Sequence, residues 1–177
     1  LPAEAQTTPV YGILVADMNT DGNLDILLTG NSYSADYMSG QYDASYGQLL
    51  TGDGNGKFKP ASLAESGFMA DGDRKSLTSI HSTDGKPLVF SLANNGKLKA
   101  FSYVQESLTS INIQPLETHA ELNMQDGSVI KEEFYYGVGY LSQASRILYI
   151  PKDVVSVKIF DSTGKNRIIS MSNDQNI

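Results

Sequence analysis

The sequence predicts an all-β fold, with one or two four-stranded antiparallel sheets followed by a small C-terminal β domain. Its apolar runs are short, and clusters of Gly, Asp and Asn such as residues 52–56 separate them, which is typical of hairpins and not of long helices. Near the C-terminus, Val155, Val157 and Ile159 alternate with other residues, as in a strand with one buried face. Both patterns favour strands over most of the chain.

The composition limits the classes of function. The chain has 177 residues, 40% hydrophobic and 19% charged, which suits a soluble protein of one medium or two small domains. A net charge of -7 argues against a nucleic-acid surface, which needs clustered Lys and Arg. The absence of Cys excludes disulfides, thiolate metal sites and a cysteine nucleophile. No apolar run reaches the roughly 20 residues of a membrane span.

The expected strands fall into three groups. The first sheet is expected at 10–16, 24–29, 47–51 and 57–61, and the second at 76–81, 87–92, 97–103 and 110–113. A separate β unit is expected at 119–124, 129–136, 146–150, 154–161 and 167–170. We therefore predict two domains, residues 1–116 and residues 117–177. Residues 1–8 lack the basic start and apolar stretch of a signal peptide, so we expect the chain to begin within a longer protein.

The motif with the most specific chemistry is the acidic loop, residues 17–25, which reads Asp-Met-Asn-Thr-Asp-Gly-Asn-Leu-Asp. Oxygen-bearing side chains stand at its positions one, three, five and nine, and glycine stands at position six. Calcium prefers six to eight oxygen ligands, and alternate residues of a coiled loop can direct them at one centre. The expected side-chain ligands are Asp17, Asn19, Asp21 and Asp25, with Asn23 contributing its backbone carbonyl.

The acidic loop is not an EF-hand. Its twelfth position is Leu28, where an EF-hand needs a bidentate Glu, and its flanks are predicted strands instead of helices. The alternative is an Asp/Asn/Gly-rich hairpin loop that caps its own backbone and binds nothing. Calcium is the favoured interpretation because crowded carboxylates repel one another unless a cation neutralises them.

Two motifs together resemble a known repeat. The acidic loop before an apolar strand ending at Gly30, and the later Gly-Asp-Gly-Asn-Gly-Lys-Phe at 52–58, are similar to an FG-GAP or VCBS repeat, the blade of integrin-type β-propellers. The resemblance implies propeller-like sheets, calcium at Asp17, Asn19, Asp21 and Asp25, and further blades as partners. At the matching place the second sheet reads His-Ser-Thr-Asp-Gly-Lys, residues 81–86, so we expect a single calcium site.

The last third resembles an ASPIC/UnbV domain. The similarity lies in Asp126-Gly127, in Gly-Val-Gly-Tyr-Leu-Ser-Gln at 137–143 and in Asp-Ser-Thr-Gly at 161–164. Such domains commonly follow the repeats above in bacterial secreted proteins. The resemblance therefore implies an extracellular, cell-surface or periplasmic location, and it transfers no chemistry to particular residues.

A second candidate site is the tyrosine loop, residues 31–46, which is long for a hairpin connection. It carries four tyrosines, Tyr33, Tyr37, Tyr42 and Tyr46. Tyrosine rings can stack on sugar faces, and the nearby Asp36 and Asp43 can accept hydrogen bonds from hydroxyls, so we expect a surface for a glycan or another protein. The alternative is that the rings cover the neighbouring sheet.

The sequence favours a calcium-stabilised, non-catalytic scaffold for extracellular binding or adhesion at a bacterial surface. No catalytic residue is assigned, because His81 and His119 fit no zinc spacing and no Gly-x-Ser-x-Gly elbow occurs. Glu132 and Glu133 are adjacent on a predicted strand and so face opposite sides. One alternative is a purely structural segment that closes a larger propeller. The other is part of an enzyme whose active site lies upstream.

Overall fold

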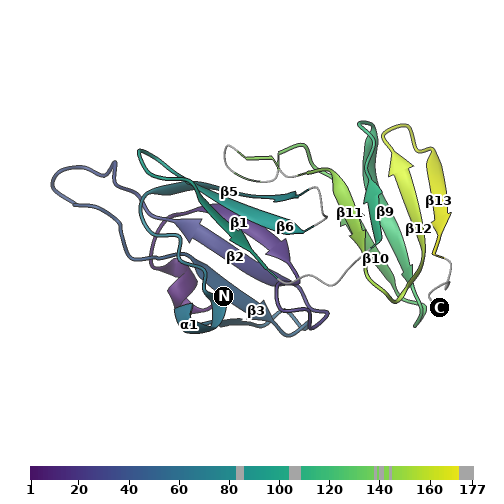
Figure 1. The fold of residues 1–177 in the computed structure, drawn as a ribbon, viewed down its shortest axis with the longest axis horizontal. Helices are drawn as coiled ribbons and strands as arrows, with labels where there is room; N and C mark the ends of the chain where they lie inside the picture. Colours follow the sequence, from purple (N-terminus) through teal and green to yellow (C-terminus); the bar gives the residue numbers. More distant parts are fainter. Residues whose placement is uncertain (83–85, 104–108, 138, 140–141, 144, 172–177) are drawn as a thin grey trace. The chain divides into compact units, whose positions relative to one another are not determined.

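The computed structural model confirms an all-β chain of antiparallel sheets (Figure 1). It describes all residues except 83–85, 104–108, 138, 140–141, 144 and 172–177. The chain splits into two compact units: unit 1 is Leu1–Glu106 with Gly137–Ser145, and unit 2 is Ser107–Tyr136 with Arg146–Ile177. The predicted domain boundary at residue 116 falls within unit 2.

The first sheet of unit 1 has four strands in the order β1-β2-β3-β4, as predicted. Its strands are β1 (Val10–Ala16), β2 (Asp25–Gly30), β3 (Gln48–Gly52) and β4 (Phe58–Pro60), preceded by the 3-10 helix η1 (Ala3–Gln6) and followed by α1 (Leu63–Ser66). The acidic loop joins β1 to β2, and a Gly-rich turn joins β3 to β4. Asp53 holds that turn, because its Oδ1 accepts hydrogen bonds from the amides of Asn55 and Lys57.

The second sheet of unit 1 has three strands, not the predicted four. It consists of β5 (Arg74–His81), β6 (Pro87–Ala93) and β7 (Lys99–Ser102) in that order. The segment expected as its fourth strand forms β8 (Thr109–Asn112) and pairs with β11 (Ile147–Ile150) in unit 2. The reason is burial, since Ile111 packs in the apolar core of unit 2.

The two sheets of unit 1 share one core. Buried side chains from both sheets and from the segment between α1 and β5 form a single cluster: Leu14, Leu27, Phe68, Ala70, Leu77 and Val89. The sheets approach closely at Gly12 in β1, where an added Cβ would lie 2.5 Å from the Cβ of Leu77 and 2.6 Å from Cγ2 of Thr29. Only a residue without a side chain permits this packing.

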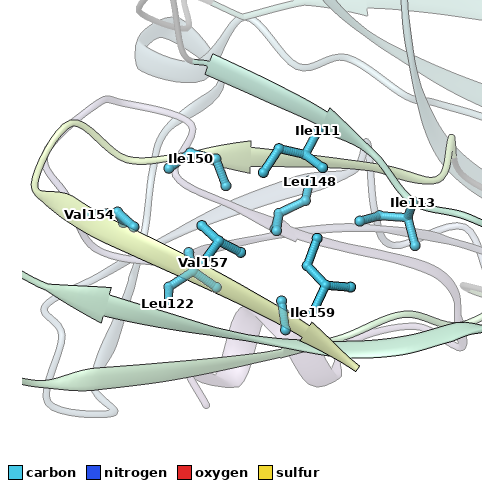
Figure 2. Packing of buried hydrophobic residues seen from close by; sticks show 9 residues of the cluster. Ile111, Ile113, Leu122, Leu148, Ile150, Val154, Val157 and Ile159 are labelled. Atoms are coloured by element: carbon cyan, nitrogen blue, oxygen red, sulfur yellow. The ribbon is translucent and has the colours of Figure 1, made fainter. Parts of the chain in front are cut away.

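Unit 2 is built on a four-stranded sheet in the order β10-β9-β12-β13. Its strands are β9 (Glu117–Met124), β10 (Val129–Glu133), β12 (Val154–Asp161) and β13 (Asn166–Ser170). Figure 2 shows how aliphatic side chains from β12, such as Val157 and Ile159, face Ile111 and Leu148 of the β8–β11 pair. The predicted alternation thus holds for Val157 and Ile159 but is wrong for Val155, which is 48% exposed because the strand register shifts between Val154 and Ser156 and buries Val154 instead.

The segment 137–143, read as part of the C-terminal domain, belongs to unit 1. Thr78 in β5 donates a hydrogen bond of 2.8 Å to the carbonyl of Gln143, and the amide of Ser145 donates to the carbonyl of Ser79. Val138, Tyr140 and Leu141 of this motif lie outside the described residues, as do Thr83, Asp84 and Gly85 of the other motif. Within the described ranges, no helix has the length and apolar character needed to cross a membrane.

Glu117 and Arg167 form an ion pair in unit 2, and we expect it to make unit 2 sensitive to acid. Burial acts to raise the pKa of Glu117, but hydrogen bonds from Arg167 (2.6 Å) and from the amide of Gln114 (2.7 Å) outweigh it and lower the pKa below 4.5. A lowered pKa contributes stability at neutral pH that is lost as the pH falls through the folded-state value.

The measurement for this pair is the urea midpoint of unit 2, followed by NMR signals of β9 and β12 across a pH series. Glu117→Gln should be less stable than the wild type at neutral pH, and the difference should shrink below pH 4.5. A difference that stays constant across the series would contradict a role for the charge.

Candidate functional site

The acidic loop coils around the carboxylate of Asp17. Oδ1 of Asp17 accepts a hydrogen bond of 3.2 Å from the amide of Asp21, and Oδ2 accepts one of 2.9 Å from the amide of Gly22. The backbone reaches this geometry through positive φ angles of 62° at Thr20 and 86° at Gly22. Glycine adopts such an angle without steric cost, so Gly22 is the residue that permits the turn.

The next carboxylate along the loop, Asp21, is also held by local hydrogen bonds. Its Oδ1 accepts a hydrogen bond of 2.8 Å from the amide of Asn23, and its Oδ2 accepts one of 2.9 Å from Nδ2 of Asn19. The Asn23 amide, followed by the Asn19 side chain, lowers the pKa of Asp21. Asn19 in turn accepts a hydrogen bond at Oδ1 from the amide of Asp21. Asp21 is therefore ionised at neutral pH.

Asp25 behaves differently, because it is completely buried at the first position of β2. Its Oδ2 accepts a hydrogen bond of 2.9 Å from the amide of Met18, and its Oδ1 accepts one of 2.9 Å from the amide of Gly52. Asp25 therefore fastens the acidic loop to the end of β3. The sequence pattern did not reveal this contact, since Gly52 lies far along the chain.

The Gly-rich turn lies against the acidic loop. A Cβ at Gly54 would come within 2.4 Å of Oδ1 of Asn23, so the turn and the side chain of Asn23 are in close contact. Gly54 also has a positive φ of 71°. The two motifs that resemble one repeat are therefore neighbours in space as well as in order along the first sheet.

The oxygen atoms of the acidic loop are of the kind that calcium binds, but they are not grouped around one point. Each oxygen of Asp17, Asp21 and Asp25 accepts one hydrogen bond, and a carboxylate oxygen has a further lone pair for a cation. Among the described residues, no three or more His, Cys, Asp or Glu side chains are grouped so that they could hold a metal ion. Calcium binding would thus require the Asp17 and Asp21 side chains to move towards Asp25, which its two hydrogen bonds hold in place.

The structure places the four candidate tyrosines differently along the tyrosine loop, which extends beyond the end of β2 (Figure 1). Tyr37 is 98% exposed, and Tyr42 and Tyr46 are also exposed. The backbones of Ser32 and Tyr42 exchange two hydrogen bonds of 2.9 Å, which closes the loop at its base. Tyr33 lies at this base, where its hydroxyl donates a hydrogen bond of 2.8 Å to Asp43 and this bond raises its pKa to about 12.

Asn31 anchors the tyrosine loop, a role that sequence analysis missed. It is completely buried and has a positive φ of 80°. Its Nδ2 donates hydrogen bonds to Oδ1 of Asp43 and to the carbonyls of Ser45 and Gly72. Its Oδ1 accepts hydrogen bonds from Thr8 and from the amide of Ser45. One side chain thus joins both ends of the loop to the segment before β5.

Beside this loop lies the polar cleft, which sequence analysis also missed. Its volume is about 680 Å³, and it is lined by three parts of unit 1. These are residues 33, 34 and 41 of the tyrosine loop, residues 71–74 before and at the start of β5, and residues 93–97 with Lys99 between β6 and β7. Two sequence signals, Asp-Gly-Asp-Arg at 71–74 and Asn-Asn-Gly-Lys at 94–97, mark its walls.

Neither histidine belongs to the acidic loop, the tyrosine loop or the lining of the polar cleft. The ring of His119 stacks on Phe160, its partner across β9 and β12, with the centroids 4.6 Å apart. His81 is the last residue of β5. Comparison with known proteins adds no assignment, because no protein-family model matches the chain and no curated protein matches it either.

Proposed function

We propose that this chain is a calcium-stabilised, non-catalytic binding scaffold of an extracellular protein. The observation that carries the proposal is the acidic loop, in which Asp17 and Asp21 share one tightly coiled turn with Asn19. The loop is already wound by its own hydrogen bonds, so a cation would need to displace little backbone. Calcium would relieve the repulsion among the carboxylates and fix the loop against β3.

The residues that would hold the ion are the five that the sequence indicates. Asn19 and Asp21 offer oxygens on exposed side chains, the partly buried Asp17 offers its carboxylate, and Asn23 offers its backbone carbonyl. Asp25 would contribute from the buried side while keeping its hydrogen bonds to Met18 and Gly52. The ion would act on stability and not on a reaction.

An extracellular setting suits such a site. Calcium-binding modules outside the cell hold the ion with dissociation constants of about 0.1 to 1 mM, which match calcium levels there. The resemblance to FG-GAP or VCBS repeats followed by an ASPIC/UnbV domain supports the same location. The order of the first sheet, with the acidic loop and the Gly-rich turn side by side, supports the repeat-like part of that resemblance.

Calcium is expected to raise the thermal stability of unit 1. At about 10 mM calcium, a dissociation constant of about 0.1 to 1 mM adds about 1.4 to 2.7 kcal/mol to the free energy of unfolding. The corresponding rise in Tm is about 5 °C or more. The measurement is differential scanning calorimetry in calcium and in EDTA, with magnesium at equal concentration as the control ion.

Asp17→Ala should lose this calcium response. Asp36→Ala is the matched control, because it removes an exposed carboxylate of unit 1 outside the acidic loop. A wild-type chain with the same Tm in calcium and EDTA, or an Asp17→Ala variant that responds as the wild type does, would remove calcium from the proposal.

A second candidate is a structural segment that closes a larger β assembly and has no ligand of its own. It is favoured by β1, the edge strand of the first sheet, where Ile13 and Val15 are about half exposed. Apolar side chains on an edge strand suit contact with a further sheet. This candidate predicts that unit 1 binds no small ligand, and the experiment in the next subsection tests that point.

A further inference from the structure

The walls of the polar cleft are held rigidly by buried hydrogen bonds. Arg74 is 3% exposed, and its guanidinium donates to the carbonyls of Asp71 (2.6 Å), Ser91 (2.9 Å) and Lys97 (2.9 Å). The amide of Asn94 donates to the carbonyl of Asp73 at 2.8 Å. These bonds join the turn before β5 to the turn between β6 and β7. The cleft is therefore formed before any ligand arrives.

The tyrosine loop supplies the third wall, and Asn31 fixes it. Nδ2 of Asn31 lies 3.1 Å from the carbonyl oxygen of Gly72 and 3.0 Å from Oδ1 of Asp43. The same Oδ1 accepts a hydrogen bond from the hydroxyl of Tyr33. The Tyr33 hydroxyl is therefore positioned at the edge of the cleft by a chain of two hydrogen bonds. Preformed walls lower the entropic cost of binding a ligand.

The charges of the cleft are compensated within the protein. Asp73 has a nearly fully buried side chain, and Nζ of Lys75 lies 2.6 Å from its Oδ1. Asp71 pairs with Lys99, and Nη2 of Arg74 lies 3.8 Å away. A metal cation therefore finds carboxylates that are already neutralised. The cations of these pairs, Lys75, Lys99 and Arg74, are equally engaged, so the pairs offer an anion no free positive charge.

The lining of the cleft suits a polar ligand that also has an apolar face. Amide, hydroxyl and charged groups lie beside apolar surface, to which the Tyr33 ring and Ala93 contribute. The cleft volume of about 680 Å³ lies within the roughly 300 to 1,000 Å³ of small-ligand pockets. A neutral, polar small molecule remains as the class of ligand that fits both the charge and the size.

One accessible pair of groups in the cleft sets a hydrogen-bond acceptor beside a donor. Oδ1 of Asp71 contacts Nζ of Lys99, and both side chains are partly exposed, whereas Asp73, which accepts a hydrogen bond from Nδ2 of Asn94, is nearly fully buried. Each hydroxyl of a sugar both donates and accepts, so two neighbouring hydroxyls can bond to such a pair at once. We propose that the polar cleft binds a neutral saccharide through vicinal hydroxyls, with the Tyr33 ring against one face of the sugar.

Side chains at the mouth of the cleft are available for the same ligand. In the described part of the chain, Gln41, Asn95 and Lys97 make no side-chain hydrogen bond or ion pair. All three are exposed at the rim, and each can donate a hydrogen bond to a sugar hydroxyl. The assignment names the ligand for the binding role proposed above, and it rests on that role.

The experiment is isothermal titration calorimetry of the full chain in calcium, at low and at high salt. The probes are xylohexaose, cellohexaose, maltohexaose and mannohexaose as neutral saccharides, with hexagalacturonate as the charged comparison. We expect at least one neutral probe to bind, with little dependence on salt, because no net charge is neutralised. Failure of all four neutral probes, or binding of hexagalacturonate alone, would overturn the assignment.

Two substitutions at the rim locate the binding site. Asn95→Gly keeps the positive φ of 53° and removes the side chain, and Lys97→Ala removes the side-chain donor but keeps the backbone carbonyl that Arg74 uses. The double variant should bind about tenfold more weakly, since it loses about two hydrogen bonds to the sugar. Tyr37→Ala is the matched control, because Tyr37 is 98% exposed and does not line the cleft.

The opposite pattern, in which Tyr37→Ala abolishes binding and the double variant keeps it, would move the site to the tip of the tyrosine loop and overturn the proposal. The Tm of every sample is measured in calcium and in EDTA. If calcium still raises the Tm but no saccharide binds, only the proposal of a saccharide site in the cleft is rejected. If saccharide binds but calcium does not change the Tm, only the proposal of a calcium site is rejected.

Discussion

Asp25→Ala is expected to destabilise unit 1 by about 2 to 6 kcal/mol even when calcium is chelated. The Asp25 carboxylate is completely buried and accepts hydrogen bonds from the amides of Met18 and Gly52. Alanine leaves both amides without an acceptor, at a cost of about 1 to 3 kcal/mol for each buried donor. The measurement is urea unfolding in EDTA, followed by NMR signals of β2 and β3.

The control for Asp25 is Asp21→Ala, which removes an exposed carboxylate from the same loop. In EDTA it should leave the urea midpoint far closer to that of the wild type than Asp25→Ala does. Equal effects of the two substitutions in EDTA would contradict a stabilising role for the hydrogen bonds of Asp25. A separation between them would show that this aspartate supports the fold before any metal is considered.

Asn31→Ala is expected to have the other large effect, a loss of about 3 to 6 kcal/mol. The buried Asn31 side chain makes five hydrogen bonds, which involve Thr8, Asp43, Ser45 and Gly72. Alanine leaves several of these groups unpaired, and it must adopt a φ of 80°, which costs an L-residue about 1 to 2 kcal/mol. Urea unfolding of unit 1 measures the loss.

Asn31→Gly separates the two causes, since glycine tolerates the positive φ but makes none of the side-chain bonds. It should be destabilised by about 1 to 2 kcal/mol less than Asn31→Ala. Hydrogen exchange in residues 31–46 should increase in both variants, because the loop loses its anchor. Wild-type exchange in this loop would contradict the anchoring role of Asn31.

The features of the fold that could be predicted from the sequence are those fixed by local contacts. The hairpin of β3 and β4 is one example, because Asp53 and the glycines around it determine the turn within a few residues. The strand at 110–113 was assigned to the wrong sheet. Its alternation shows a buried face, but nothing near Ile111 in sequence indicates that Leu148 is its partner.

The same distinction applies to the sites. The composition of the acidic loop is visible in the sequence. The orientation of the Asp25 carboxylate is not, because it depends on a hydrogen bond from the amide of Gly52 in a different strand. The polar cleft could not be predicted, because its walls come from separate segments that meet only after both sheets have packed. Asn31 was likewise read as the start of a loop, although its contacts reach as far as Gly72.

The packing at Gly12 limits which fragments of unit 1 can keep their core. Leu14 and Leu27 from the first sheet pack with Leu77 and Val89 from the second, and a glycine brings the two layers together. A fragment that ended after β4 would expose half of this shared interior to water, at about 25 cal/mol for each Å² of apolar surface. The four-stranded sheet is therefore not expected to fold as an independent domain. The shortest fragment that keeps the core must also include β5 and β6.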